Sequence, residues 1–196
     1  LNILSPSKEK PLQLKENILK CKFPHIFKKN NYLILVDSIE EKQKYQKALS
    51  GLSNAEIFVK RSKFQSERYA YLLDKSEADY YLIGSDDVYF ENTDLYSKID
   101  YKCNVLTCTN EDKLIINHPI ISEKIKKNLI DLLYKYNFKS LCIDTLISFN
   151  CNKNQRQSIS LIANHLNFNK QITKSMYKTY MHDLIIFLIY ALLNFL

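Results

Sequence analysis

Short apolar runs alternate with amphipathic segments through the first half of the chain. Such runs are typical of buried strands, and the amphipathic segments between them predict helices. Strands that are joined through helices lie parallel in one sheet, with right-handed crossovers. The predicted strands are residues 2–5, 32–36, 55–59 and 80–84, and the predicted helices are residues 11–21, 39–49 and 66–73.

Signals for helix ends support this reading of the first half. Pro11 suits the first turn of a helix, where its missing N–H costs nothing. Ser38 followed three residues later by Glu41 forms a capping box, which predicts a helix that begins at Ile39. Gly51 supplies a left-handed residue at the end of that helix.

The pattern changes after about residue 100. Strands are expected at 103–107 and 114–117, joined by a polar turn at 110–112, and a third apolar segment, 141–143, ends at Asp144. An amphipathic helix is expected after Ser122, and the polar stretch 150–158 predicts a boundary. Two helices, 159–166 and 170–195, should follow it. We therefore expect an α/β domain over residues 1–150 and a helical C-terminal extension over residues 151–196.

Carboxylates stand where three of these apolar segments end. Asp37 follows the second predicted strand, Asp86 and Asp87 follow the fourth, and Asp144 follows residues 141–143. The carboxyl ends of parallel strands meet at one edge of a sheet, so these side chains are expected to surround one crevice. Adjacent carboxylates repel each other, and a hard divalent cation that also holds phosphate oxygens would offset that repulsion. The pattern predicts a phosphate-bearing substrate.

Composition narrows the choice of chemistry. The net charge of +7 favours anionic partners such as nucleotides, nucleic acid or an acidic membrane surface. With only two glycines, Gly51 and Gly84, the chain has no glycine-rich phosphate loop, so phosphates would need a metal and side chains. Five cysteines without CxxC spacing indicate a reducing compartment. The apolar segment 184–196 is shorter than a membrane span, which favours a buried helix over membrane or partner contact.

The order of these features resembles the nucleotide-sugar glycosyltransferases of the GT-A fold, especially the large inverting family two. The likeness covers roughly residues 1–150 and rests on four segments. They are Ser5-Pro6 before a helix, the strand that ends at Asp37, the helix around Ser66-Glu67-Arg68, and the strand that leads into Ser85-Asp86-Asp87-Val88. The resemblance implies a GT-A-like (Rossmann-like), mostly parallel sheet flanked by helices, with a helical C-terminal tail.

The resemblance also implies roles for single residues. Asp87, helped by Asp86, corresponds to the family's DxD motif and would hold Mn2+ or Mg2+ with the donor diphosphate. Ser5, Asp37, Arg68 and Asp86 would bind the donor, a UDP-sugar or another NDP-sugar, with Asp37 at the base. Asp144 would act as the general base that deprotonates an acceptor hydroxyl. The family's arginine after the first strand is absent here, and Lys8 or Lys10 is the substitute.

Simpler structural roles stand beside these assignments. Asp86 and Asp87 could form a solvated turn, Asp37 could assist the cap of the next helix, and Asp144 could be a helix N-cap. Arg68 could be an exposed structural arginine. For His118, packing beside Pro119 is favoured over contact with a metal.

Two other functions stay open. A sugar nucleotidyltransferase could use a similar aspartate, but its glycine-rich N-terminal loop is missing. A non-catalytic basic α/β module could bind nucleic acid or protein. For a transferase, the acceptor would be a glycan, a lipid-linked sugar or modified DNA. The expected location is cytoplasmic, with the inner face of a membrane as an alternative reached through the C-terminal helix.

Overall fold

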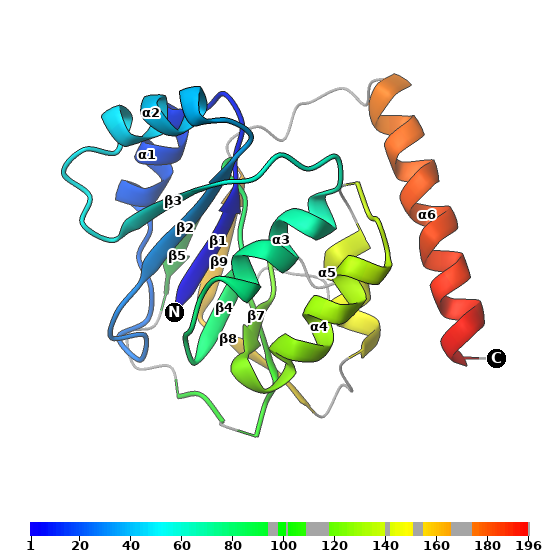
Figure 1. The fold of residues 1–196 in the computed structure, drawn as a ribbon. Coiled ribbons are helices and arrows are strands. Elements are labelled where there is room, and N and C mark those ends of the chain that lie inside the picture. The colour runs from blue at the N-terminus through cyan, green and yellow to red at the C-terminus, as the bar shows by residue number, and fades with distance from the viewer. Residues whose placement is uncertain are drawn as a thin grey trace.

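A seven-stranded, mostly parallel sheet forms the centre of the computed structural model (Figure 1). The structure describes residues 1–93, 98–100, 102–108, 118–139, 142–150, 155–165 and 174–195. The strand order is β3-β2-β1-β4-β7-β6-β8, and only β7 runs antiparallel to its neighbours. The strands are β1 (Asn2–Pro6), β2 (Asn31–Val36), β3 (Ala55–Val59), β4 (Tyr80–Ile83), β6 (Val105–Cys108), β7 (Ile120–Ser122) and β8 (Arg156–Ile159).

Layers of helix and strand cover both faces of this sheet. The helices are α1 (Pro11–Lys20), α2 (Ile39–Ala48), α3 (Gln65–Asp74), α4 (Glu123–Lys135), α5 (Cys142–Asn150) and α6 (Lys174–Phe195). Helices α3, α4 and α5 pack on one face. The other face carries α1, α2 and a two-stranded antiparallel sheet of β5 (Val88–Asn92) and β9 (Leu161–His165).

Side chains alternate in direction along each strand, and they form two separate hydrophobic cores, one on each face of the sheet. In β1, Leu4 points to the face covered by α3 and α4, whereas Ile3 points to the face covered by α1. In β4, Tyr81 and Ile83 belong to the first core and Leu82 to the second. Successive side chains of a strand point to opposite faces, so runs that are apolar throughout are those buried on both sides. The α/β class and the parallel strands expected from the sequence are confirmed.

The capping signals work as expected, with one difference. The Oγ of Ser38 accepts a hydrogen bond from the N–H of Glu41 at 3.2 Å. The carboxylate of Glu41 accepts from the N–H of Asp37 at 2.8 Å, one residue before the position a capping box requires. Gly51 has the expected left-handed backbone, with φ of +91°.

The second half of the chain differs from several expectations. Residues 156–159 and 161–165, expected in or before a helix, form strands β8 and β9, which pair with β6 and β5. Residues 142 and 143, expected in a strand, begin helix α5 instead. The expected strand 114–117 and the turn 110–112 lie outside the described residues.

Helix α6 forms the expected C-terminal tail and lies outside α4 and α5 in Figure 1. Its buried side carries Asp183, whose carboxylate accepts from the N–H of Lys139 at 2.7 Å. It also carries Tyr190, whose hydroxyl donates to the Oδ1 of Asn150 at 2.7 Å. Within the described part of the chain, no helix is long and apolar enough to cross a membrane. The favoured expectation of a buried helix is wrong for much of this segment, because Ile185, Leu188 and Leu193 are 53 %, 52 % and 68 % exposed. Membrane or partner contact through this helix stays a prediction.

The first core gives a direct test of the fold. Leu133 in α4 is 0 % exposed, whereas Leu12 in α1 is 68 % exposed. We expect Leu133→Ala to lower the free energy of unfolding by about 2–5 kcal/mol, because it leaves a cavity between α4 and the sheet. Leu12→Ala, the matched control, should change it by no more than about 0.5 kcal/mol in the same urea titration. Equal effects of the two substitutions would contradict this packing.

Candidate functional site

The order of the strands places a crevice between β1 and β4. From β1 the chain adds β2 and β3 on one side and then crosses back to place β4 on the other side of β1. In open α/β sheets, ligands bind outside the carboxyl ends of the strands where the order reverses in this way. The segments that leave β1 and β4 here are Ser7–Lys10 and Gly84–Asp87.

A close approach of backbones fixes the end of β4 against β1. The N–H of Gly84 donates to the carbonyl of Leu4 at 3.0 Å. A Cβ at position 84 would lie 3.0 Å from that carbonyl oxygen and 3.1 Å from a methyl group of Ile3. Gly84 therefore lets the segment that carries Asp86 and Asp87 lie directly beside β1. Ser5, predicted as a donor-binding residue, is buried in β1 beneath this contact.

Asp86 is held by groups from the β1–α1 connection. Its Oδ2 accepts a hydrogen bond from the Oγ of Ser7 at 2.8 Å, and its Oδ1 lies 3.5 Å from the Nζ of Lys10. Its backbone carbonyl accepts from the amide of Asn17 at 2.8 Å. The buried Tyr45 of α2 completes the network, since its hydroxyl is 2.6 Å from the Oγ of Ser7 and accepts from the N–H of Lys10 at 3.1 Å.

Asp87 has a different local environment. Its carboxylate accepts a hydrogen bond from the hydroxyl of Ser85, so the two side chains after Gly84 orient each other. Among the described residues, no group of three or more His, Cys, Asp or Glu side chains could hold a metal ion. A cation at Asp87 would therefore need further ligands from a substrate or water. His118 is packed as expected, with its ring edge-on to Phe90 at 5.8 Å.

Asp37 and Arg68 form an ion pair at the end of β2. The guanidinium of Arg68 lies 2.8 Å from the Oδ1 of Asp37 and donates to the carbonyl of Leu35 at 3.4 Å. Arg68 is 8 % exposed, so the alternative of an exposed structural arginine is wrong. The pair fixes the Asp37 carboxylate at the carboxyl end of β2.

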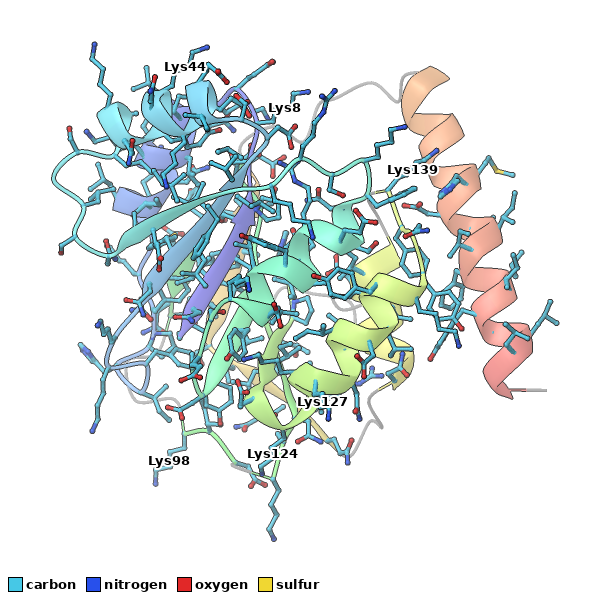
Figure 2. All side chains as sticks on the ribbon, viewed as in Figure 1. Lys8, Lys44, Lys98, Lys124, Lys127 and Lys139 are labelled. Carbon is cyan, nitrogen blue, oxygen red and sulfur yellow. The ribbon has the colours of Figure 1, made fainter. Side chains whose placement is uncertain are left out.

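A cavity of about 330 Å3 opens beside Asp37. It lies at the carboxyl ends of β1, β2 and β3, and Lys8, Lys44 and Arg61 bring cationic groups to it. Figure 2 shows Lys8 and Lys44 at the same end of the molecule, beside α2. The cavity has room for part of a nucleotide, and its mixture of cationic and carboxylate groups suits a base and a phosphate. Its other lining residues are Glu9, Ser38 and Glu41.

Asp144 lies in the first turn of α5, and Tyr69 connects it to the strand-end pair. The hydroxyl of Tyr69, which is buried in α3, donates to the carbonyl of Gly84 at 2.5 Å. Burial raises the pKa of Tyr69, and the negative charges of Asp144, Asp86 and Asp87 raise it further. All three carboxylates therefore act on one hydroxyl. Burial also raises the pKa of Asp144 to about 7, which suits a general base at neutral pH.

The structure thus brings five of the predicted site residues to one edge of the sheet: Asp37, Arg68, Asp86, Asp87 and Asp144. Tyr45 and Tyr69 could not be identified from the sequence as site residues, because a tyrosine within a helical apolar stripe is indistinguishable from a core aromatic. Ser7 was also missed, although its place directly after the first strand was a usable signal. Lys10, one of the two lysines expected to replace a missing arginine, forms an ion pair with Asp86 at 3.5 Å.

Comparison with known proteins identifies the fold. No protein-family model matches the sequence, and no curated protein does. Among solved structures, TarS 1–349 of S. aureus with UDP-GlcNAc superposes with a TM-score of 0.56 at 11% identity, over 95% of this chain and 66% of that one. The mannosyltransferase PcManGT of Pyrobaculum calidifontis, with GDP-Man and Mn2+, gives 0.51 at 9% identity, over 65% and 46%.

A third neighbour belongs to a different class of enzyme. It is the 4-diphosphocytidyl-2C-methyl-D-erythritol synthase of Anaerococcus prevotii, with a TM-score of 0.54 at 9% identity over 94% of both chains. The chain spans from about half to two thirds of the length of the two glycosyltransferase structures. It has the GT-A fold of the nucleotide-sugar glycosyltransferases, as the resemblance in sequence implied.

Because the pKa of Asp144 is raised, the free energy of unfolding should depend on pH. An aspartate titrates near 3.9 in an unfolded chain, so the native state holds an extra proton up to about pH 7 and loses stability as the pH rises through that window. Asp144→Asn cannot ionise. It should therefore be more stable than the wild type in urea titrations, with a larger gain at pH 8 than at pH 5.

Asp131 in α4 is exposed and provides the control. Asp131→Asn should give the same small change in the free energy of unfolding at both pH values. A gain for Asp144→Asn that does not depend on pH would show that the carboxylate is not desolvated.

Proposed function

We propose that this chain transfers a sugar from a nucleoside diphosphate sugar to an acceptor hydroxyl, in a metal-dependent reaction that inverts the anomeric centre. Asp37 reads the donor base, the Asp86–Asp87 pair binds the metal and diphosphate, and Asp144 is the general base. Arg68 contributes to donor binding by positioning Asp37. Ser5, which is buried in β1 next to Leu4, contributes by packing its side chain beside Gly84.

One observation carries this proposal: the buried Tyr69 hydroxyl donates to the carbonyl of Gly84 at the switch point between β1 and β4, where the charges of Asp144, Asp86 and Asp87 all raise its pKa. The first two come from a strand end and the third from a helix almost sixty residues later. A solvated turn would not gather carboxylates from separate elements around a buried tyrosine. The arrangement fits a crevice in which Asp86 and Asp87 bind the diphosphate on one side and Asp144 is the general base on the other.

The reaction follows from the protonation states of these groups. Ionised Asp144 accepts the proton of the acceptor hydroxyl as that oxygen forms a bond to the anomeric carbon of the donor. The bond from that carbon to the phosphate oxygen breaks, and its electron pair leaves with the nucleoside diphosphate. Attack from the side opposite the leaving group inverts the anomeric centre. Lys8, Lys44 and Arg61 contribute positive charge near the departing diphosphate.

The residues present fit a divalent cation of the kind seen in PcManGT. Mg2+ and related hard cations are usually held by one or two carboxylates together with substrate phosphates. Asp87 supplies one such carboxylate, and Asp86 lies next to it. A divalent cation would neutralise the charge that grows on the leaving diphosphate. Either Mn2+ or Mg2+ satisfies these oxygen ligands.

The choice of substrate is guided by the neighbours. Their structures contain UDP-GlcNAc and GDP-Man, which favours a nucleotide-sugar donor for this chain. For the acceptor we keep the three classes named from the sequence: a glycan, a lipid-linked sugar or modified DNA. We place the reaction in the cytoplasm, with the inner membrane face as the alternative.

A second candidate is a sugar nucleotidyltransferase. Its support is the match to the diphosphocytidyl-methylerythritol synthase, which covers 94% of both chains. Against it stands the β1–α1 connection, Ser7-Lys8-Glu9-Lys10, which contains no glycine. The products separate the two reactions, because a nucleotidyltransferase releases pyrophosphate from a nucleoside triphosphate. A glycosyltransferase releases a nucleoside diphosphate.

Donor binding tests the metal assignment. We expect Asp87→Ala to abolish the Mn2+-dependent binding of a nucleotide sugar in calorimetry, since it removes the carboxylate that joins the cation to the protein. Asp131→Ala should bind the donor as the wild type does. Unchanged affinity in folded Asp87→Ala, with its thermal midpoint as the check on folding, would refute the assignment.

Turnover tests the base. Asp144→Asn should lower kcat by about 10²–10⁴-fold while donor affinity stays the same, because only proton transfer is lost. The wild-type rate should fall as the pH drops below about 7, where Asp144 becomes protonated. A pH profile for Asp144→Asn that keeps the wild-type acidic limb would assign the base to another group.

A further inference from the structure

Helix α6 lies on the outside of the molecule and exposes large apolar side chains along one side (Figure 1). Their exposed fractions run from 44 % for Ile189 to 68 % for Leu193. We call these six residues the α6 face: Leu184, Ile185, Leu188, Ile189, Leu192 and Leu193. Together they leave roughly 600 Å2 of apolar surface in water, the upper end of the range for the largest patch on a monomer.

The opposite side of α6 is fixed to the domain, so a rotation of the helix cannot bury the α6 face. Asp183 is 0 % exposed and bonds to the backbone of Lys139, and Tyr190 is 2 % exposed and bonds to Asn150. The ring of Tyr190 also packs edge-on against Tyr136, with centroids 5.1 Å apart. A helix that is apolar on all sides is normally buried on all sides. The α6 face therefore needs a further surface to cover it.

The α6 face is free of charge, which bears on what covers it. Residues 184–196 contain no Lys, Arg, Asp or Glu, whereas the chain as a whole has a net charge of +7. Two copies can meet here without placing like charges against each other, which contact through their basic surfaces would do.

The distribution of polar residues on α6 favours a protein surface over a lipid surface. A helix that lies on an acidic membrane usually carries lysine and arginine on the side away from the lipid. Residues 181–196 contain neither, and the side of α6 away from the α6 face packs on the domain and holds the carboxylate of Asp183.

The spacing of the α6 face suits a second copy of the same helix. Its residues form two rows at intervals of four, which are Leu184-Leu188-Leu192 and Ile185-Ile189-Leu193. Such rows are ridges, and in the commonest class of helix packing they enter the grooves between the same rows of another helix. In an antiparallel pair, position 185 lies opposite position 192 of the other copy, and 188 lies opposite 189. One two-fold axis therefore brings every residue of the face against another residue of the face.

We propose that the α6 face is the contact between two copies of this chain, which pair antiparallel through α6. The pair buries roughly 1,200 Å2 in total, the lower end of the range for specific, stable interfaces. A contact of this size gives a dissociation constant in the micromolar range. The pairing does not depend on the proposed transfer reaction, in which α6 takes no part.

Sedimentation equilibrium of the full chain tests the pairing. The mean mass should rise from 23.2 kDa towards twice that value as the protein concentration increases. Ile185→Lys and Leu192→Glu should each raise the dissociation constant at least about tenfold, because each places a charge in an apolar contact. Leu12→Lys adds the same charge as Ile185→Lys at a 68 % exposed leucine of α1, and should leave the dissociation constant within about twofold.

A mixture of the two α6 variants tests the antiparallel arrangement. When one chain of Ile185→Lys pairs with one chain of Leu192→Glu, the new lysine faces the new glutamate and the other such contact keeps its wild-type residues. The equimolar mixture should therefore dimerise about tenfold more tightly than either variant alone. Both variants alter exposed side chains, so their thermal midpoints should match the wild type and confirm that they fold.

Four results would overturn the proposal. The first is a mass of 23.2 kDa at every protein concentration, and the second is equal weakening by Ile185→Lys and Leu12→Lys. The third is a mixture that pairs no better than its components. The fourth is a monomer that binds vesicles of phosphatidylglycerol and phosphatidylcholine and loses that binding in Leu192→Glu, which assigns the face to lipid. None of them bears on the donor site, because Asp87→Ala tests that site with a nucleotide sugar.

Discussion

The close contact between β1 and β4 is the constraint on which the candidate site depends. The two strands are far apart in the sequence and pair only because the chain reverses direction across the sheet after β3. Gly84 is the point at which this pairing ends, and the absence of a side chain there lets its N–H reach the carbonyl of Leu4. Beyond that contact, Asp86 accepts a hydrogen bond from Ser7, and Asp87 follows it at the crevice.

The cost of gathering carboxylates explains much of the surrounding structure. Asp86 is offset by Lys10 and Ser7, and Asp37 by the buried guanidinium of Arg68. Asp144 is desolvated by burial, which raises its pKa to about 7. Groups with strongly shifted pKa values in a crevice are candidates for function, because folding alone gives no reason to keep them there.

The sequence predicted the first four strands and three helices because their signals are local. The Ser38–Glu41 cap, Gly51 and the short apolar runs all act within a few residues. Strand β9 was missed because a short apolar segment reads equally well as a helix, and β8 because residues 156–158 are polar and read as a boundary. What decides is pairing with β5 and β6, dozens of residues away. The same limit applies to the site. Carboxylates at strand ends could be found, but the link from Asp144 to Asp86 runs through Tyr69, whose sequence context looks like core.

The most direct test of the site uses the paramagnetism of Mn2+. With UDP present and Mn2+ added well below one equivalent, we expect the amide signals of Ser85, Asp86, Asp87 and Tyr69 to broaden first. This follows because residues 85–87 leave the end of β4, where the Tyr69 hydroxyl donates to Gly84 and the Ser85 hydroxyl donates to Asp87. Broadening that begins elsewhere, or that is the same with and without the nucleotide, would contradict a donor site at the junction of β1 and β4.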